Sequence, residues 1–144
     1  MVKMVDISAK PEVARAATAS GFIRLRPETL KKIKDGKLPK GDVMAVAKTA
    51  AVVAVKKTPE LIPLTHPIPI TGVDVELKLE KGGVRATVEV KSTGKTGVEM
   101  EALAGVSAAL LTVWDMTKGM EKDKSGQYPT TVIDGIKVLR KLKG

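Results

Sequence analysis

The fold is decided by residues 71–90, which read Thr-Gly-Val-Asp-Val-Glu-Leu-Lys-Leu-Glu-Lys-Gly-Gly-Val-Arg-Ala-Thr-Val-Glu-Val. Apolar and polar residues alternate over 73–79 and again over 84–90, a pattern typical of half-buried strands. Glu80-Lys81-Gly82-Gly83 between them predicts a tight turn, so the two strands form a hairpin. One face of the first strand carries Asp74, Glu76 and Lys78, and the other carries Val73, Val75, Leu77 and Leu79.

Two further strands flank this hairpin in the sequence. Residues 21–26 alternate apolar and basic residues, which predicts a first strand, and residues 131–139 predict a last strand followed by a basic tail. Residues 1–20 show no clear period and are expected to form an irregular arm.

Three helices are expected between these strands. Pro27 opens a short helix that ends near Asp35-Gly36. Asp42 is a plausible N-cap for an alanine- and valine-rich helix over 43–57. A long helix follows over 98–122, whereas the four prolines within 59–69 predict a rigid, extended connection.

The order of elements is strand, helices, strand, strand, helix, strand. This order predicts one α+β domain over residues 1–144 with a ferredoxin-like βαββαβ fold, in which helices cover one face of an antiparallel sheet. The long helix is apolar over most of its circumference, so we expect a second subunit to cover it.

Composition excludes several kinds of function. The chain has no cysteine, which rules out disulfides and thiolate catalysis, and its single histidine cannot build a multi-histidine metal centre within one subunit. No stretch is apolar enough to cross a membrane, and the N-terminus lacks a signal-peptide core, so a cytoplasmic location is expected. The net charge of +9 fits either a lysine-coated surface or attraction of a polyanion.

Charged residues gather around the start of the long helix. Residues 92–101 read Ser-Thr-Gly-Lys-Thr-Gly-Val-Glu-Met-Glu. A P-loop would need glycine at position 89, which is Glu89, so that motif fails. The turn could still bind phosphate or simply connect a strand to a helix. Glu99 and Glu101 can stabilise the helix start, but they project to different faces, so one of them can line a pocket.

A second charged group lies near the end of the same helix. Asp115 and Lys118 share a face because they are three residues apart, and Lys122 continues it. The two residues could form a solvated ion pair. Alternatively, Val113, Trp114 and Met116 could surround them, so that they form a partly buried pair whose pKa values suit proton transfer. Glu99 lies sixteen residues from Asp115, roughly 24 Å along one helix. A site that used both residues would therefore need two antiparallel copies of the chain.

Five motifs occur in an order that resembles one family. They are Met4-Val5-Asp6-Ile7-Ser8-Ala9-Lys10, Lys40-Gly41-Asp42-Val43, Leu61-Ile62-Pro63-Leu64-Thr65-His66-Pro67, Gly94-Lys95-Thr96-Gly97-Val98-Glu99-Met100-Glu101-Ala102-Leu103 and Asp115-Met116-Thr117-Lys118. Over essentially its whole length the chain resembles the molybdenum cofactor biosynthesis protein C family, the cyclic pyranopterin monophosphate synthases.

The resemblance implies a lyase that converts 3′,8-cyclo-7,8-dihydroguanosine triphosphate to cyclic pyranopterin monophosphate and diphosphate. It also implies a ferredoxin-like fold and a homo-hexamer, a trimer of dimers with the site at the dimer interface. No resident metal is implied, although Mg²⁺ can accompany the substrate triphosphate.

The resemblance also assigns roles to individual positions. It implies catalytic roles for Lys40, Asp115 and Lys118. Substrate binding would fall to Lys10, Arg15, His66, Glu99, Met100, Glu101 and Lys141. The sequence departs from the family at Thr65 and Thr117, where cysteine is frequent, and in the short tail after Lys141.

Two other functions compete with the lyase. A ferredoxin-like RNA-binding module would use the positive charge, but RNA-binding sheets stack bases on strand aromatics and the predicted strands hold only Phe22. A structural oligomer or a nucleotide sensor is the other alternative, and turnover of the cyclised substrate separates it from an enzyme.

Overall fold

The computed structural model describes residues 1–144 and contains one four-stranded sheet in the order β2-β3-β1-β4. Every pair of neighbouring strands is antiparallel. The elements follow one another as β1 (Val13–Arg24), α1 (Pro27–Asp35), α2 (Val43–Lys56), α3 (Thr58–Leu61), β2 (Ile70–Glu80), β3 (Gly83–Gly94), α4 (Glu99–Glu121) and β4 (Val132–Lys143).

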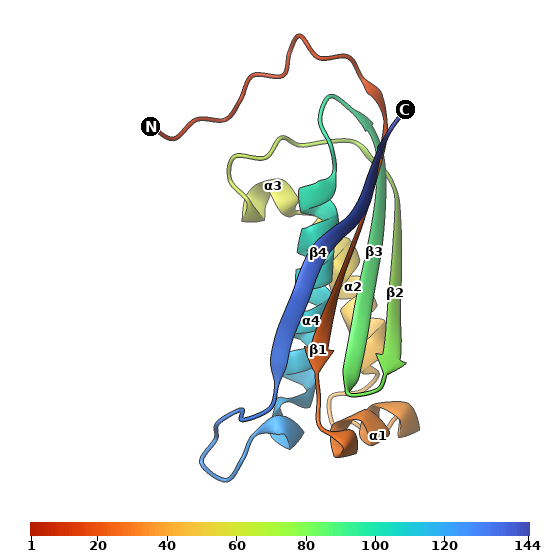
Figure 1. Cartoon of the computed structure of the whole chain (residues 1–144), viewed down its shortest axis with the longest axis vertical. Helices are drawn as coiled ribbons and strands as arrows, with labels where there is room; N and C mark the ends of the chain where they lie inside the picture. Colours follow the sequence, from red (N-terminus) through yellow and green to blue (C-terminus); the bar gives the residue numbers. More distant parts are fainter.

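This topology confirms the predicted α+β, ferredoxin-like class. Strand β3 lies between β1 and β2, as the split βαβ arrangement requires. The long helices α2 and α4 run along one face of the sheet, and the other face is open (Figure 1). None of the helices combines the length and hydropathy that a membrane crossing requires.

The hairpin over residues 70–94 has the predicted register. Val73, Val75, Leu77 and Leu79 of β2 pack against the core, while Asp74, Glu76 and Lys78 are exposed. On β3 the core-facing positions are fully buried: Val84, Ala86, Val88 and Val90. The alternation in the sequence therefore identified the buried face correctly.

The first strand is longer than predicted. It begins at Val13, so the irregular N-terminal arm covers residues 1–12 rather than about 1–20. Residues 13–20 are mostly small, and their pattern carries little signal. They become a strand because β3 and β4 supply backbone partners on both sides, with Val13 opposite Gly94 and Arg15 opposite Lys143.

The last strand also continues beyond its predicted end. β4 runs from Val132 to Lys143 and includes the basic tail, whereas the pattern predicted a strand over 131–139. It is an edge strand with nearly every side chain exposed, and it contains two register irregularities opposite β1. Exposed basic residues are common on such edges, so charge alone did not distinguish strand from tail.

The connection over 59–69 is not wholly extended. Its beginning forms the short helix α3, with Pro59 in the first turn, a position that tolerates proline. The Thr58 hydroxyl donates to the Ala54 carbonyl oxygen at 2.9 Å, which ties α3 to the end of α2.

Helix α4 is partly uncovered within one chain. Its buried positions include Ala102, Val106, Ala109 and Val113, but Leu111 is 61% exposed and Met100 is 41% exposed. The single chain therefore leaves this face of the helix exposed. A second subunit on this face stays a prediction.

The C-terminal end of α4 is fixed by a buried carboxylate that the sequence pattern did not reveal. Glu121 is fully buried and accepts hydrogen bonds from the Arg26 backbone N–H, at 3.0 Å, and from the hydroxyls of Thr29 and Thr131. The Arg26 side chain also donates to the Met120 carbonyl oxygen. These contacts hold the start of α1 and the approach to β4 against the end of α4.

We expect Glu121→Ala to destabilise the fold strongly. The substitution leaves three buried donors without an acceptor, at about 1–3 kcal/mol each, so the free energy of unfolding should fall by about 3 kcal/mol or more. Denaturant unfolding measures the change. The exposed Glu60→Ala serves as the matched control and should shift stability by less than about 0.5 kcal/mol. Equal stability of the two variants would contradict the role of Glu121.

Candidate active site

The predicted site residues fall into two groups at opposite ends of α4. Lys40, Asp115 and Lys118 form the helix-end group, next to α1. The helix-start group lies near α3 and the N-terminal arm, and it consists of Lys10, Arg15, His66, Glu99, Met100, Glu101 and Lys141. Figure 1 shows that the length of the helix separates these two regions.

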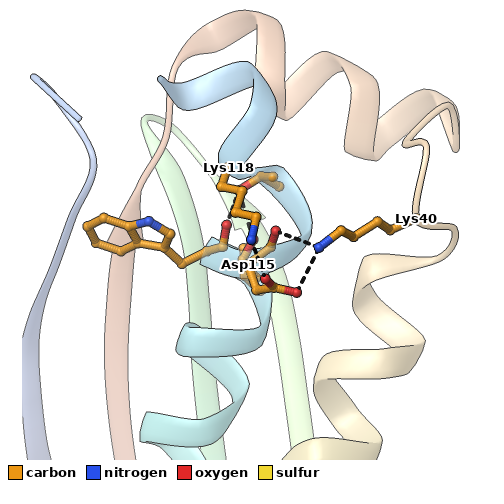
Figure 2. A network of polar contacts seen from close by, with 6 residues as sticks. Lys40, Asp115 and Lys118 are labelled. Atoms are coloured by element: carbon orange, nitrogen blue, oxygen red, sulfur yellow. Dashed lines mark hydrogen bonds and ion pairs between the residues drawn. The ribbon is translucent and has the colours of Figure 1, made fainter. Parts of the chain in front are cut away.

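In the helix-end group two lysines share one carboxylate. The Lys40 ammonium lies 3.0 Å from Asp115 Oδ2, and the Lys118 ammonium lies 3.2 Å from Asp115 Oδ1. Lys118 is on the same helical face as Asp115, whereas Lys40 reaches across from the loop before α2 (Figure 2). That loop is held by Asp42, whose carboxylate accepts from the Ala45 N–H and caps α2 as predicted.

The Lys40 hydrogen bond is the main reason that the pKa of Asp115 lies below its ordinary value, and the Lys118 hydrogen bond lowers it further. Asp115 therefore stays ionised and orients both ammonium groups. The expectation that this pair is partly buried is wrong, since the three side chains are between 44% and 57% exposed. Val113 is buried on the far side of the helix, and Met116, although it is buried and lines the adjoining cavity, does not cover the three charged groups.

A cavity of about 430 Å³ adjoins these side chains. Lys122, which follows the last residue of α4, adds a further cation to its lining. Three lysines around one carboxylate leave a net positive surface, which suits a phosphate-bearing ligand.

The helix-start group surrounds a second cavity, of about 360 Å³. His66, Glu99, Met100 and Glu101 line it together with Lys10 of the arm. Lys141 of β4 joins the group through an ion pair, with its ammonium 3.5 Å from Glu99 Oε2. The spacing predicted that only one of the two carboxylates would line a pocket, but both line this cavity. They differ in burial, because Glu101 is only 3% exposed, whereas the Glu99 side chain is 29% exposed.

Burial raises the pKa of Glu101 above its ordinary value, and the negative charge of Glu99 adds to the effect. A carboxyl group in this state holds its proton more firmly than a surface glutamate and can deliver it as a general acid. Glu101 therefore has the environment of an acid–base group.

Arg15 does not line the second cavity; it lines a separate one of about 330 Å³ together with Lys91, Ser92 and Leu142. Its Nε donates to the Gly94 carbonyl oxygen at 3.2 Å, and its buried Nη2 has no partner in the chain. An unsatisfied guanidinium N–H is a free donor, and Arg15 thereby retains capacity to bind an anion.

The two positions that depart from the resembled family have structural roles. The Thr65 hydroxyl donates to the Ile62 carbonyl oxygen, and the Thr117 hydroxyl, which is buried, donates to the Val113 carbonyl oxygen. Both hydroxyls are thus engaged by the local backbone.

The family resemblance assigned only Lys10 and Arg15 of the expected arm to the site. Lys3, Val5 and Ile7 also line the second cavity, and sequence reasoning missed these three residues. The Lys95 ammonium donates to the Ser8 carbonyl oxygen at 3.3 Å and does not point to an empty phosphate loop. No periodic pattern in the sequence marks the Lys95 contact, because it is made to a backbone oxygen. No three His, Asp or Glu side chains lie together in a way that could hold a metal ion.

The raised pKa of Glu101 has a consequence for stability. The unfolded chain loses this proton near the ordinary value of 4.5, while the folded chain retains it to higher pH. Stability therefore falls as pH rises from 4.5 through the raised pKa. We expect Glu101→Gln to be more stable than the native chain at neutral pH, with the difference vanishing below pH 4.5. Denaturant unfolding of both chains between acidic and neutral pH measures the difference in their free energies of unfolding. A difference that does not change with pH would contradict the raised pKa of Glu101.

Comparison of the sequence with known proteins identifies the family of this chain. The model of the MoaC family matches residues 4–144. A relative from Aeropyrum pernix is 62% identical over 141 residues, covering 98% of this chain and 97% of the relative. One from Methanococcoides burtonii is 61% identical, covering 97% and 88%, and one from Thermococcus onnurineus is 60% identical, covering 99% and 91%. All three carry the name "Probable cyclic pyranopterin monophosphate synthase". The chain therefore belongs to the MoaC family.

Proposed function

We propose that this protein is a cyclic pyranopterin monophosphate synthase of molybdenum cofactor biosynthesis. It would convert 3′,8-cyclo-7,8-dihydroguanosine triphosphate to cyclic pyranopterin monophosphate and diphosphate. Family membership over nearly the whole chain supports the activity. The single structural observation that carries the proposal is the group in which Lys40 and Lys118 share Asp115.

The phosphate step suits this group. A hydroxyl of the sugar-derived part attacks the α-phosphorus, the bond from that phosphorus to the bridging oxygen breaks, and diphosphate leaves with the bond electrons. A base takes the proton of the attacking hydroxyl. Lys40 and Lys118 would neutralise the charge that develops on the phosphate oxygens, and Asp115 would hold both ammonium groups in position.

Proton transfers during ring opening and closure need both acids and bases. Glu101, with its raised pKa, would donate, and Glu99 would accept or orient. His66, Met100 and Lys10 would hold the ring system and the phosphates from around the cavity. Arg15 and Lys141 would add positive charge at its margin.

One protomer does not bring these two groups together, because Glu99 and Asp115 lie sixteen residues apart on α4, or roughly 24 Å at 1.5 Å per residue. We propose that two chains meet in antiparallel fashion, so that the helix-start group of each faces the helix-end group of the other. The uncovered face of α4, with exposed Leu111, supports such a contact. Three such dimers would form the expected homo-hexamer.

The proposal includes no resident metal, and Mg²⁺ would enter with the substrate triphosphate. It also includes a cytoplasmic location, where a guanosine-triphosphate-derived substrate is made.

The open sheet face offers little to the alternative of RNA binding. Phe22 is the only aromatic side chain on the strands, and the Arg85 guanidinium already lies 5.2 Å from its ring centroid. A platform for stacking successive bases would need more exposed rings.

We expect Lys118→Ala to reduce turnover of the cyclised substrate by about 100-fold or more, the range typical of a lost charged catalytic group. Mass analysis of product and released diphosphate measures the rate. Lys124→Ala, an exposed lysine six residues along the chain, is the matched control and should keep native turnover. Native activity in Lys118→Ala, with the oligomer intact by light scattering, would refute the assigned role.

The shared site makes a separate prediction. Lys118→Ala and Glu101→Gln chains should each be inactive alone. When they are refolded together in equal amounts, half of the dimers should be mixed, and one of the two sites in each mixed dimer should be intact. Activity should therefore return to about a quarter of the native value. No recovery, despite mixed oligomers detected by mass spectrometry, would show that each chain builds its own site.

A further inference from the structure

The N-terminal arm, residues 1–12, is attached to the body of the protein by two side chains. His66 Nε2 lies 2.7 Å from the Val5 carbonyl oxygen, and because a carbonyl only accepts, the histidine donates. The Lys95 ammonium donates to the Ser8 carbonyl oxygen at 3.3 Å. Asp6 lies between these two points and accepts from the Ser8 N–H, which closes a local turn.

Apart from these contacts the arm is loosely held. Every residue in it is exposed except Ile7, which is half-buried. In Figure 1 it crosses the end of the molecule above α3 and the connection between β3 and α4. With so little buried surface, the attached position has a low free energy of opening, and a ligand could readily shift it.

The arm changes the charge of the cavity it crosses. The wall that belongs to the body of the protein carries two carboxylates, Glu99 and Glu101. The lining contributed by the arm carries two ammonium groups, those of Lys3 and Lys10. Lys141 is already paired with Glu99, at 3.5 Å, so the open cavity offers a triphosphate little free positive charge, whereas the closed cavity adds the two ammonium groups of the arm.

We propose that the arm is a strap that closes over the phosphates of the bound substrate, and that Lys95 is the positioning residue that holds it closed. The inference rests on the proposed function for the identity of the substrate. Lys95 acts through the Ser8 backbone rather than on the reacting atoms. Its contact fixes the chain two residues before Lys10, and so sets where that ammonium group lies.

Lys95 and His66 both attach the arm, but only one of them also lines the cavity. His66 lines the cavity itself, so its replacement would remove substrate contacts as well as the attachment of the arm. Lys95 is absent from the lining of that cavity, and its only hydrogen bond is to the arm. A change at Lys95 therefore reports on the strap alone.

The kinetic experiment compares the native chain with Lys95→Ala, Lys95→Arg and Lys34→Ala, using the cyclised guanosine triphosphate derivative as substrate. Lys34 is an exposed lysine of α1 and serves as the control for lost charge. We expect Lys95→Ala to raise KM about fivefold to tenfold with kcat within about twofold, since a long, exposed hydrogen bond contributes about as much as an ordinary intramolecular one. Lys95→Arg should restore most of the affinity, and Lys34→Ala should match the native chain.

The second measurement does not depend on turnover. Amide hydrogen exchange of residues 4–10 is followed with and without inorganic triphosphate. The arm of the native chain should exchange more slowly when triphosphate is present, and Lys95→Ala should lose most of that protection. The strap proposal would be refuted if triphosphate did not change the amide exchange of the arm. It would also be refuted if Lys95→Ala kept the native KM and the native protection.

The two measurements also separate the inference from the proposed function. A native chain that fails to turn over the substrate, but whose arm is protected by triphosphate through Lys95, would refute the synthase and keep the strap. Turnover with an arm that does not respond to triphosphate would keep the synthase and refute the strap.

Discussion

The packing of α4 against the sheet is the constraint on which the rest of the structure depends. Small residues let the backbone of the helix come close. A side chain at Gly105 would meet Val55 and Val88 at 3.0–3.1 Å, and one at Gly21 of β1 would meet Val106 and Leu110. The buried stripe of Ala102, Val106, Ala109 and Val113 then fills the layer between sheet and helix. Because a close-packed core tolerates little shift, the orientation of α4 about its axis is fixed.

That fixed orientation determines where the charged side chains of α4 lie. Glu99 and Glu101 are in its first turn and Lys118 is in its last, positions where the helix dipole favours carboxylates and ammonium groups respectively. The charges that the chemistry would use therefore also suit the ends of the helix. Glu121, bonded to Arg26, Thr29 and Thr131, anchors the far end of α4, where Asp115 lies 3.0 Å from the Lys40 ammonium.

The sequence predicted most of the fold because its signals are local. Strict alternation in 73–79 and 84–90 identified both strands and their buried faces. The order of elements then left the split βαβ arrangement as the simplest sheet. Residues three apart on a helix share a face, and the pairing of Asp115 with Lys118 follows from that rule alone. Helical position likewise singled out Glu99 and Glu101, whereas the other members of the helix-start group were assigned only by the family resemblance.

Other features depend on partners far away in the chain. Residues 13–20 and the basic tail are strands because β1 pairs with β3 on one side and β4 on the other, and no local pattern encodes that pairing. The burial of Glu101 and Glu121, the exposure of Asp115 and the course of the arm likewise arise from packing. By itself, the sequence determined the class of fold, the family motifs and the sign of the charges. Only the tertiary structure decided which charges meet, because hydrogen bonds to backbone oxygens and burial in a core leave no periodic trace in the chain.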